Sequence, residues 1–227
     1  LGASSGVYGA TDRFCIVTNG IGGRMTIEQS TDTPSGFGNS VKLSCTTTDT
    51  SIAAGDYLSF STRLEGRDMQ RFAKGTSDAE KFAVSFYVKG NASATYVCEL
   101  YEYDNFRHVS QTFSVTTAWT RVELSFPADT TGTIDNDSNL SFAINIYLHA
   151  GSNFTGGTLQ TTWSGSGFRA TGTDNFFDST SRTLFLTGVQ LEVGDNATPF
   201  EHLPFQDQLI LCQRYFHKAN LPMVATS

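Results

Sequence analysis

Several aromatic and amide side chains stand at alternating positions of strand-like segments, where they could bind a sugar. Tyr87 lies in KFAVSFYVK, Tyr101 in CELYEYD, and Asn145 and Tyr147 in NLSFAINIYLH, with Trp163 in the loop-like region beyond. Sugar rings stack their apolar C–H faces on aromatic rings, while amides bond the hydroxyl groups at the edge. If the strands that carry Tyr87 and Asn145/Tyr147 are neighbours, these groups form a shallow groove for a glycan. The alternative is that the tyrosines reflect strand propensity or pack against another subunit.

Catalysis has fewer candidate residues. Glycoside hydrolysis needs two carboxylates about 5–10 Å apart. Glu99, Glu102 and Asp104 occur together, but alternation places Glu99 on the face of Tyr101 and the other two on the opposite face. The sequence contains no GxSxG or HExxH motif, and its histidines lie in unrelated contexts, at 108, 149, 202 and 217. We therefore expect no enzyme activity.

A structural calcium ion is a further possibility, at the oxygen-rich segment IDNDSN (residues 134–139). This segment lacks the DxDxDG spacing of a calcium loop, so an ordinary Asn/Asp turn is favoured. The GDN segment at 194–196 is a weaker candidate. We expect no cofactor.

The elements that would position these side chains are strands. Strand-like segments separated by Gly, Asn, Asp and Thr recur near 13–18, 25–29, 40–47, 57–65, 81–89, 94–103, 109–116, 119–126, 139–149, 158–163 and 182–193. Two of them alternate cleanly, which predicts an inward apolar face and a solvated outer face. The inward residues are Phe82, Val84, Phe86 and Val88 in one strand and Leu140, Phe142, Ile144, Ile146 and Leu148 in the other. A short helix is expected within 66–75, and a long loop region around the strand at 158–163 spans 150–182.

Composition supports an all-β fold and excludes some partners. The chain has 227 residues, of which only 16% are charged, and its net charge is −7. Because nucleic-acid binders carry basic patches, this charge argues against a nucleic-acid partner. No apolar run is long enough to cross a membrane, and no signal peptide is recognisable. The chain begins without a methionine, so we expect a piece of a longer protein.

The four cysteines stand singly, at 15, 45, 98 and 212. The first three fall inside strand-like text, and no CxxC pair or Cys/His cluster exists. This pattern predicts isolated buried thiols rather than zinc or redox chemistry, and it fits synthesis in a reducing cytoplasm.

The C-terminal region predicts a separate helix. Beyond Pro204, apolar side chains repeat at intervals of 4, 3 and 4 residues, at Phe205, Leu209, Cys212 and Phe216. This spacing gives one apolar stripe on a helix over 205–218, which must pack either on its own sandwich or on copies of itself. We therefore expect a β-sandwich over 7–200 and a C-terminal helical segment over 201–227.

Residues 184–216 also carry a family resemblance. GVQLEVG (188–194), ATPFEH (197–202) and LCQRYF (211–216) resemble a segment of bacteriophage appendage proteins such as tail fibres and head fibres, in which it closes a β-sandwich. TTAWTRVELSFP (116–127) resembles the jelly rolls of carbohydrate-binding modules, with Trp119 expected in core or rim packing. The resemblance implies an antiparallel jelly-roll β-sandwich, a virion location, other virion proteins as partners and a homotrimer.

Three functions follow from this resemblance as expectations. The first is a tail-fibre domain that attaches to a bacterial surface glycan. The second is a head-fibre or capsid-decoration protein with a structural role, and the third is the non-catalytic part of a glycan depolymerase.

Overall fold

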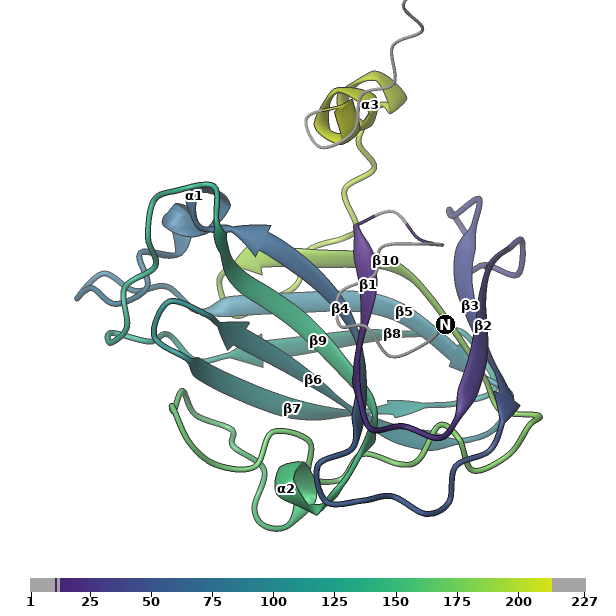
Figure 1. Cartoon of the computed structure of the whole chain (residues 1–227). Helices are drawn as coiled ribbons and strands as arrows, with labels where there is room; N and C mark the ends of the chain where they lie inside the picture. Colours follow the sequence, from purple (N-terminus) through teal and green to yellow (C-terminus); the bar gives the residue numbers. More distant parts are fainter. Residues whose placement is uncertain (1–10, 12, 214–227) are drawn as a thin grey trace, which may run out of the picture.

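The chain folds into two antiparallel sheets packed face to face (Figure 1). The computed structural model describes residues 11 and 13–213. Sheet A has the strand order β1-β4-β9-β6-β7, with bounds Phe14–Asn19, Tyr57–Glu65, Leu140–Ala150, Ala94–Glu102 and Arg107–Val115. Sheet B has the order β2-β3-β10-β5-β8, with bounds Arg24–Ser30, Ser40–Thr47, Thr183–Val193, Phe82–Gly90 and Thr120–Phe126. The predicted all-β sandwich is therefore confirmed.

Ten of the eleven predicted strands form, and the exception is 158–163. This segment instead runs beside β7, the edge strand of sheet A, and makes only isolated bonds to it. The amide of His108 donates to the carbonyl of Ser164 (2.8 Å), and that of Ser110 donates to Gln160 (2.7 Å). The prediction of a strand was wrong because the chain turns inward here to place Trp163 in the core. The bonds it does make cover part of an otherwise open sheet edge.

The core lies between the sheets and contains the side chains that alternation assigned to it, except Leu140, which is only partly buried and lies outside the core cluster. Four inward residues of β5 have no exposed surface, namely Phe82, Val84, Phe86 and Val88. Those of β9 from Phe142 to Leu148 are equally buried. Phe176 and Phe177, from the segment 151–182 between β9 and β10, join the same cluster. Burial of large aromatic side chains supplies much of the free energy that holds the sheets together.

The outer face of β9 is not solvated, contrary to the prediction. Asn145, Tyr147 and His149 are all at most 5% exposed. Segment 151–182 covers them: Ala170 and Phe154 pack beside Tyr147, and the side chain of Asn175 bonds His149 (2.7 Å). This segment contains the single-turn helix α2 (Ser152–Thr155) and lies at the lower end of the sandwich in Figure 1. Alternation identified the two faces of the strand correctly, but not the long connection that covers one of them.

A buried ion cluster closes one end of the interior. The ammonium of Lys74 lies 3.3 Å from a carboxylate oxygen of Glu102 and 3.1 Å from one of Asp129. It also donates to the carbonyls of Thr131 and Gly132 and lies 4.9 Å from the ring centre of Trp163. Arg107 pairs with Asp129 through two nitrogens, at 2.7 and 3.1 Å. These contacts compensate for the removal of both carboxylates from water.

Helices are short. The helix expected within 66–75 is a single turn, α1 (Gly66–Met69), followed by a 3-10 turn over Gln70–Phe72. The predicted C-terminal helix begins at Phe205 as α3 (Phe205–Gln213), and Figure 1 shows it standing away from the sandwich. Phe205 and Leu209 are exposed, so the described part of the stripe does not pack on its own domain. The Cys212 side chain and Phe216 lie outside the described residues.

Cys15, Cys45 and Cys98 are buried thiols, as predicted. Among the described residues, no helix is both long enough and apolar enough to cross a bilayer. The division into 7–200 and 201–227 stays a prediction.

Candidate functional site

The outer face of sheet A carries cross-strand rows of polar and aromatic side chains. Pairing between β4, β9 and β6 places residues opposite one another in the rows Ser59–Tyr147–Val97, Ser61–Asn145–Glu99 and Arg63–Ala143–Tyr101. Residues opposite one another on one face of an antiparallel pair lie about 5 Å apart at Cβ. The register therefore brings together side chains that lie far apart in the sequence.

The middle row is a chain of hydrogen bonds that ends at a buried ion pair. Ser61 Oγ donates to Asn145 Oδ1 (2.6 Å), and Asn145 Nδ2 donates to Glu99 Oε2 (2.8 Å). Arg169, from segment 151–182, donates to both oxygens of Glu99, at 2.5 and 2.8 Å. The Glu99 side chain has no exposed surface, so this bidentate pair satisfies a carboxylate removed from water. These hydrogen bonds fix the orientations of the Asn145 and Arg169 side chains.

A pocket of about 260 Å³ opens above these rows. Four tyrosines and a phenylalanine supply its aromatic lining, and the remaining lining residues are Val17, Ser59, Asn145 and Arg169. The aromatic residues are Tyr57, Tyr101, Tyr103, Tyr147 and Phe154. They come from β4, β6, the turn after β6, β9 and α2. An aromatic wall with a few fixed polar groups is the composition of a ligand-binding pocket.

The aromatic rings of the pocket pack against one another and against Arg169. The ring centres of Tyr101 and Tyr103 lie 4.7 Å apart, and those of Tyr57 and Phe154 lie 4.9 Å apart. The guanidinium of Arg169 lies 4.3 Å from the ring centre of Tyr101, a cation–π contact. Because these contacts fix the rings before any ligand arrives, binding costs less conformational entropy.

The phenols of Tyr101, Tyr103 and Tyr147 stay neutral at physiological pH. Burial raises the pKa of Tyr101 and Tyr103 above the ordinary value, and it raises that of Tyr147 further. A neutral phenol both donates and accepts hydrogen bonds. The pocket therefore offers hydroxyl groups of the kind that a polyhydroxylated ligand can bond.

Three of the five residues predicted to bind a glycan lie together in this pocket: Tyr101, Asn145 and Tyr147. Tyr87 does not join them, because β5 belongs to sheet B and its ring packs on Phe37 at 5.1 Å. The expected groove across the strands of Tyr87 and Tyr147 is therefore wrong.

Trp163 does not line the pocket either. Its side chain is 9% exposed and packs in the core against Phe82, while its Nε1 donates to the carbonyl of Pro127 (2.7 Å). The structure thus assigns a packing role to the tryptophan that the sequence suggested as a ligand platform. By contrast, the expectation for Trp119 is confirmed: it lies at the rim of sheet B, bonded to Asp32 and beside Phe185.

Sequence reasoning missed several lining residues, above all Arg169 and Phe154. Both come from segment 151–182, which has no periodicity that assigns a face. Tyr57 and Ser59 could have been found, because they alternate with the inward residues Leu58 and Phe60 in YLSFSTRLE. The missing information was which strand lies beside β9.

The acidic residues weighed for catalysis do not converge. Glu99 faces the pocket side of sheet A and Glu102 faces the interior, where it pairs with Lys74. Asp104 accepts a bond from the amide of Asp135 (2.9 Å). Each carboxylate thus has a structural partner, and Glu99 and Glu102 lie on opposite sides of the sheet, as alternation predicted.

The segment considered for calcium forms turn contacts. The carboxylate of Asp137 accepts bonds from the amide and side chain of Asn139. Among the residues described, no group of three or more His, Cys, Asp or Glu side chains is placed to hold a metal ion. Calcium binding, which also involves backbone carbonyls, stays untested.

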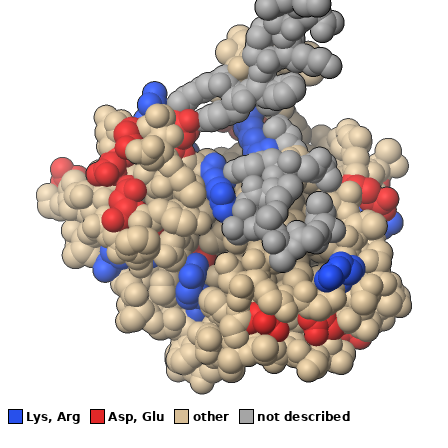
Figure 2. All heavy atoms as spheres, viewed as in Figure 1, with Lys and Arg blue, Asp and Glu red and all other residues tan. Residues whose placement is uncertain are grey.

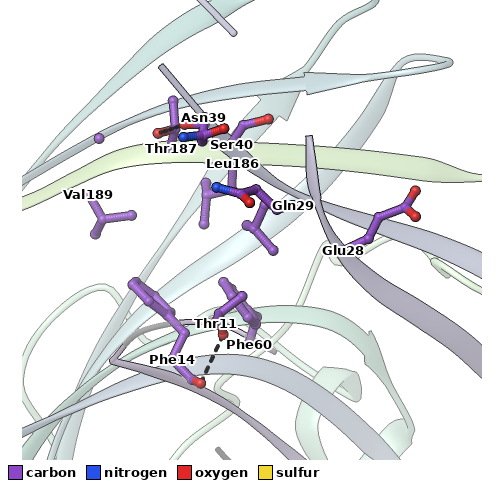
Figure 3. A pocket seen from close by; sticks show the side chains of 12 residues that line it. Thr11, Phe14, Glu28, Gln29, Asn39, Ser40, Phe60, Leu186, Thr187 and Val189 are labelled. Carbon is purple, nitrogen blue, oxygen red and sulfur yellow. Dashed lines mark hydrogen bonds between the residues drawn. The ribbon is translucent and has the colours of Figure 1, made fainter. Parts of the chain in front are cut away.

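A larger cavity, of about 470 Å³, lies between the sheets where β1 and β10 separate (Figure 3). Phe14, Phe60 and Leu186 form much of its wall, with Gln29 and Asn39 at the side of sheet B. Its lining includes Thr11, whose neighbours 10 and 12 lie outside the described residues. We therefore assign no site to this cavity.

On the face that Figure 2 shows, the charged side chains are dispersed. In the view of Figure 2, the coloured Lys and Arg atoms form separate groups rather than one continuous patch.

Comparisons with known proteins give weak structural likenesses. No protein-family model and no curated protein matches this chain. A xylan-binding CBM22 domain from Paenibacillus barcinonensis is 13% identical, with a TM-score of 0.43, over 84% of this chain and 91% of that one. A family 11 carbohydrate-binding module from Clostridium thermocellum, solved with a mixed-linked tetrasaccharide, is 9% identical, with a TM-score of 0.41, over 82% of this chain and 91% of that one.

The enzymatically active domain of tailspike protein 4 of bacteriophage CBA120 is 12% identical with a TM-score of 0.42, over 80% of this chain but only 19% of that one. At such values the likenesses carry no functional argument.

Proposed function

We propose that this chain is a glycan-binding domain and that the pocket on sheet A, lined by Tyr57, Tyr101, Tyr103, Tyr147 and Phe154, is its binding site. The observation that carries the proposal is the meeting of five aromatic rings with Asn145, Ser59 and Arg169 in one pocket. Sugar C–H faces stack on such rings, and the polar groups bond hydroxyls.

The test replaces rings that line the pocket without filling the core. Tyr101 and Tyr103 are only partly buried, so Tyr101→Ala and Tyr103→Ala should leave the sandwich folded. Each should weaken binding to a bacterial surface polysaccharide about tenfold, because a stacking surface is lost. The measurement is isothermal titration, with far-ultraviolet circular dichroism as a check of folding.

Tyr87→Ala is the matched control, because Tyr87 is a partly buried tyrosine of sheet B. Its affinity should equal that of the wild type. Equal affinity in all three folded variants would exclude this pocket as the binding site.

We further propose that the domain belongs to a phage virion appendage, a tail fibre that attaches to the host surface. The segments 188–194, 197–202 and 211–216 support this proposal through their resemblance to phage appendage proteins. Antibody labelling of intact particles tests it. Label on tail tips supports the proposal, whereas label on the capsid would indicate a head-fibre or decoration protein.

Assembly through α3 is part of the same proposal. Its described residues expose four large apolar side chains, Phe205, Leu209, Ile210 and Leu211, and a helix this short is marginal alone. We propose that three copies pack along the stripe that begins with Phe205 and Leu209. Leu209→Asp should then give monomers in light scattering, while Gln208→Asp, on a neighbouring position, should not. Intact trimers of Leu209→Asp would contradict a role for this stripe.

We also propose that the domain binds without cleaving. The carboxylates of Glu99, Glu102 and Asp104 are held by Arg169, Lys74 and the amide of Asp135. Incubation with a bound polysaccharide should release no reducing sugar. Release of reducing ends would indicate the depolymerase alternative.

A further inference from the structure

Two arginines and one carboxylate act on Tyr103 of the pocket, namely Arg63, Arg169 and Glu99. Glu99 is fully buried beneath it, and both of its oxygens already accept bonds from Arg169. Arg169 uses Nε and Nη2 for this pair, and its Nη1 makes no hydrogen bond to the part of the chain that is described. One guanidinium nitrogen therefore remains available beside the pocket.

Arg63 adds a second guanidinium to the same face. Its Nε is buried and has no hydrogen-bond partner, and it makes no ion pair with any residue of the described ranges. A buried donor without a partner costs free energy, so its presence in a folded protein calls for an explanation such as a ligand.

The register places Arg63 beside the aromatic wall. Arg63 lies opposite Ala143, which lies opposite Tyr101, so Arg63 and Tyr101 are separated by two strand spacings, about 10 Å. Ala143, which lies between them in the register, presents only a methyl group and has no exposed surface. The charge of Arg63 also acts on the pocket. Burial raises the pKa of Tyr103, and the positive charge of Arg63 partly offsets this by lowering it.

We propose that the pocket selects acidic glycans, and that Arg63 and Nη1 of Arg169 bind an oxyanion of the sugar while Tyr101 stacks on its ring. This inference rests on the proposed glycan binding and specifies its ligand class. Arginine is suited to the role because its planar fork of donors matches carboxylate and phosphate oxygens. The chain as a whole carries a net charge of −7, which repels anions at long range. Selectivity must therefore come from these short-range contacts.

The experiment compares matched polymers on the full chain. The first pair is polygalacturonate and the same polymer after chemical reduction of its carboxyl groups to alcohols. The second pair is dextran sulfate and dextran. The first pair reports on a carboxylate and the second on a sulfate ester. Affinity electrophoresis and isothermal titration measure each.

The variant Arg63→Met removes the charge but keeps an unbranched apolar stem. We expect it to weaken binding of the acidic polymer about tenfold while binding of the neutral partner stays unchanged. Arg63→Lys should recover part of the loss, because it restores the charge without the fork. Lys81→Met is the charge-matched control, because Lys81 pairs with Asp195 beside sheet B, away from the pocket, and its variant should bind like the wild type.

Three results overturn the inference, and they are distinguishable. If acidic and neutral polymers bind equally and Arg63→Met changes neither, selectivity for acidic glycans is excluded while glycan binding stands. If no polymer binds, and a wider array of neutral and acidic glycans also fails, both the glycan-binding proposal and this inference fail. A loss in Lys81→Met equal to that in Arg63→Met would show a general charge effect and would also overturn the role of Arg63.

Discussion

The outer faces of the two sheets follow the same alternating pattern and end in different environments. On sheet A, polar side chains such as Asn145 and Glu99 are covered and joined in one hydrogen-bonded chain. On sheet B, charged side chains remain at the surface and form isolated pairs, such as Lys42 with Glu28 at 2.7 Å. The difference arises from segment 151–182, which packs over sheet A.

This comparison shows how covering a polar face can turn it into a site. A polar side chain in water exchanges partners freely, so it has no fixed direction. A polar side chain that is buried keeps its hydrogen-bond partner, because breaking the hydrogen bond in a low dielectric is costly. Asn145 and Arg169 are oriented in this way, and the surface pairs of sheet B are not. The following predictions test this contrast, from the largest expected effect to the smallest.

The largest contrast is between the two tryptophans. Trp163→Ala should lower the free energy of unfolding by about 3–5 kcal/mol, because it removes a core ring that packs on Phe82 and bonds Pro127. Trp119→Ala, at the partly exposed rim of sheet B, should cost about 1 kcal/mol. Urea denaturation measures both. Similar losses would contradict the placement of Trp163 in the core.

The next contrast concerns two cations of similar length. Arg169→Met leaves the carboxylate of Glu99 buried without its charged partner, and we expect a loss of about 3 kcal/mol. This value is at the lower end for a buried pair because the Arg169 side chain keeps 26% of its exposure. Lys42→Met, which leaves Glu28 in water, should cost less than about 1 kcal/mol. Urea denaturation measures both losses. A loss below about 1 kcal/mol for Arg169→Met would contradict the role of segment 151–182 in holding this ion pair away from water.

Acid sensitivity should distinguish buried from surface carboxylates. Burial tends to raise the pKa of Asp129, but hydrogen bonds from Arg107 and Thr131 and the charge of Lys74 outweigh it, so the pKa is lowered. The folded state then binds this proton less readily than the unfolded chain, whose Asp pKa is about 3.9. The stabilisation is complete above about pH 4 and is lost as the pH falls below it.

Asp32 gives the surface comparison. A hydrogen bond from Lys89, with a second from Trp119, lowers its pKa in the same direction, but its side chain is 42% exposed. Salt at roughly 0.5 M should screen its contribution and leave that of Asp129 largely intact. Thermal melts from pH 3 to 6 in high salt measure how steeply the melting temperature falls with acid. The fall should be less steep than in the wild type for Asp129→Asn and the same as in the wild type for Asp32→Asn. An equal dependence of the melting temperature on pH in the two variants would contradict the difference between the buried and the surface carboxylate.

The smallest effect is the coupling energy of the Lys42–Glu28 pair. Both side chains are partly exposed, at 31% and 51%, so a double-mutant cycle with Lys42→Met and Glu28→Gln should give about 0.5 kcal/mol or less. A coupling of several kcal/mol would mean that sheet B is also covered, for example by another subunit.

The sequence alone determined the strands and their two faces. Alternation in β5 and β9 separated inward from outward residues correctly, because a side chain in a pleated strand has only two directions available. The same rule placed Glu99 and Glu102 on opposite faces. It also supplied Tyr101, Asn145 and Tyr147 as candidates.

Only the tertiary structure decided which of these candidates meet and what covers them. Strand order put Tyr87 in sheet B, and pairing between distant strands set Arg63 in line with Ala143 and Tyr101. The long segment after β9 sent Trp163 inward and Arg169 over the pocket. Local periodicity does not contain this information, because strand order and loop packing depend on contacts between residues that are far apart along the chain.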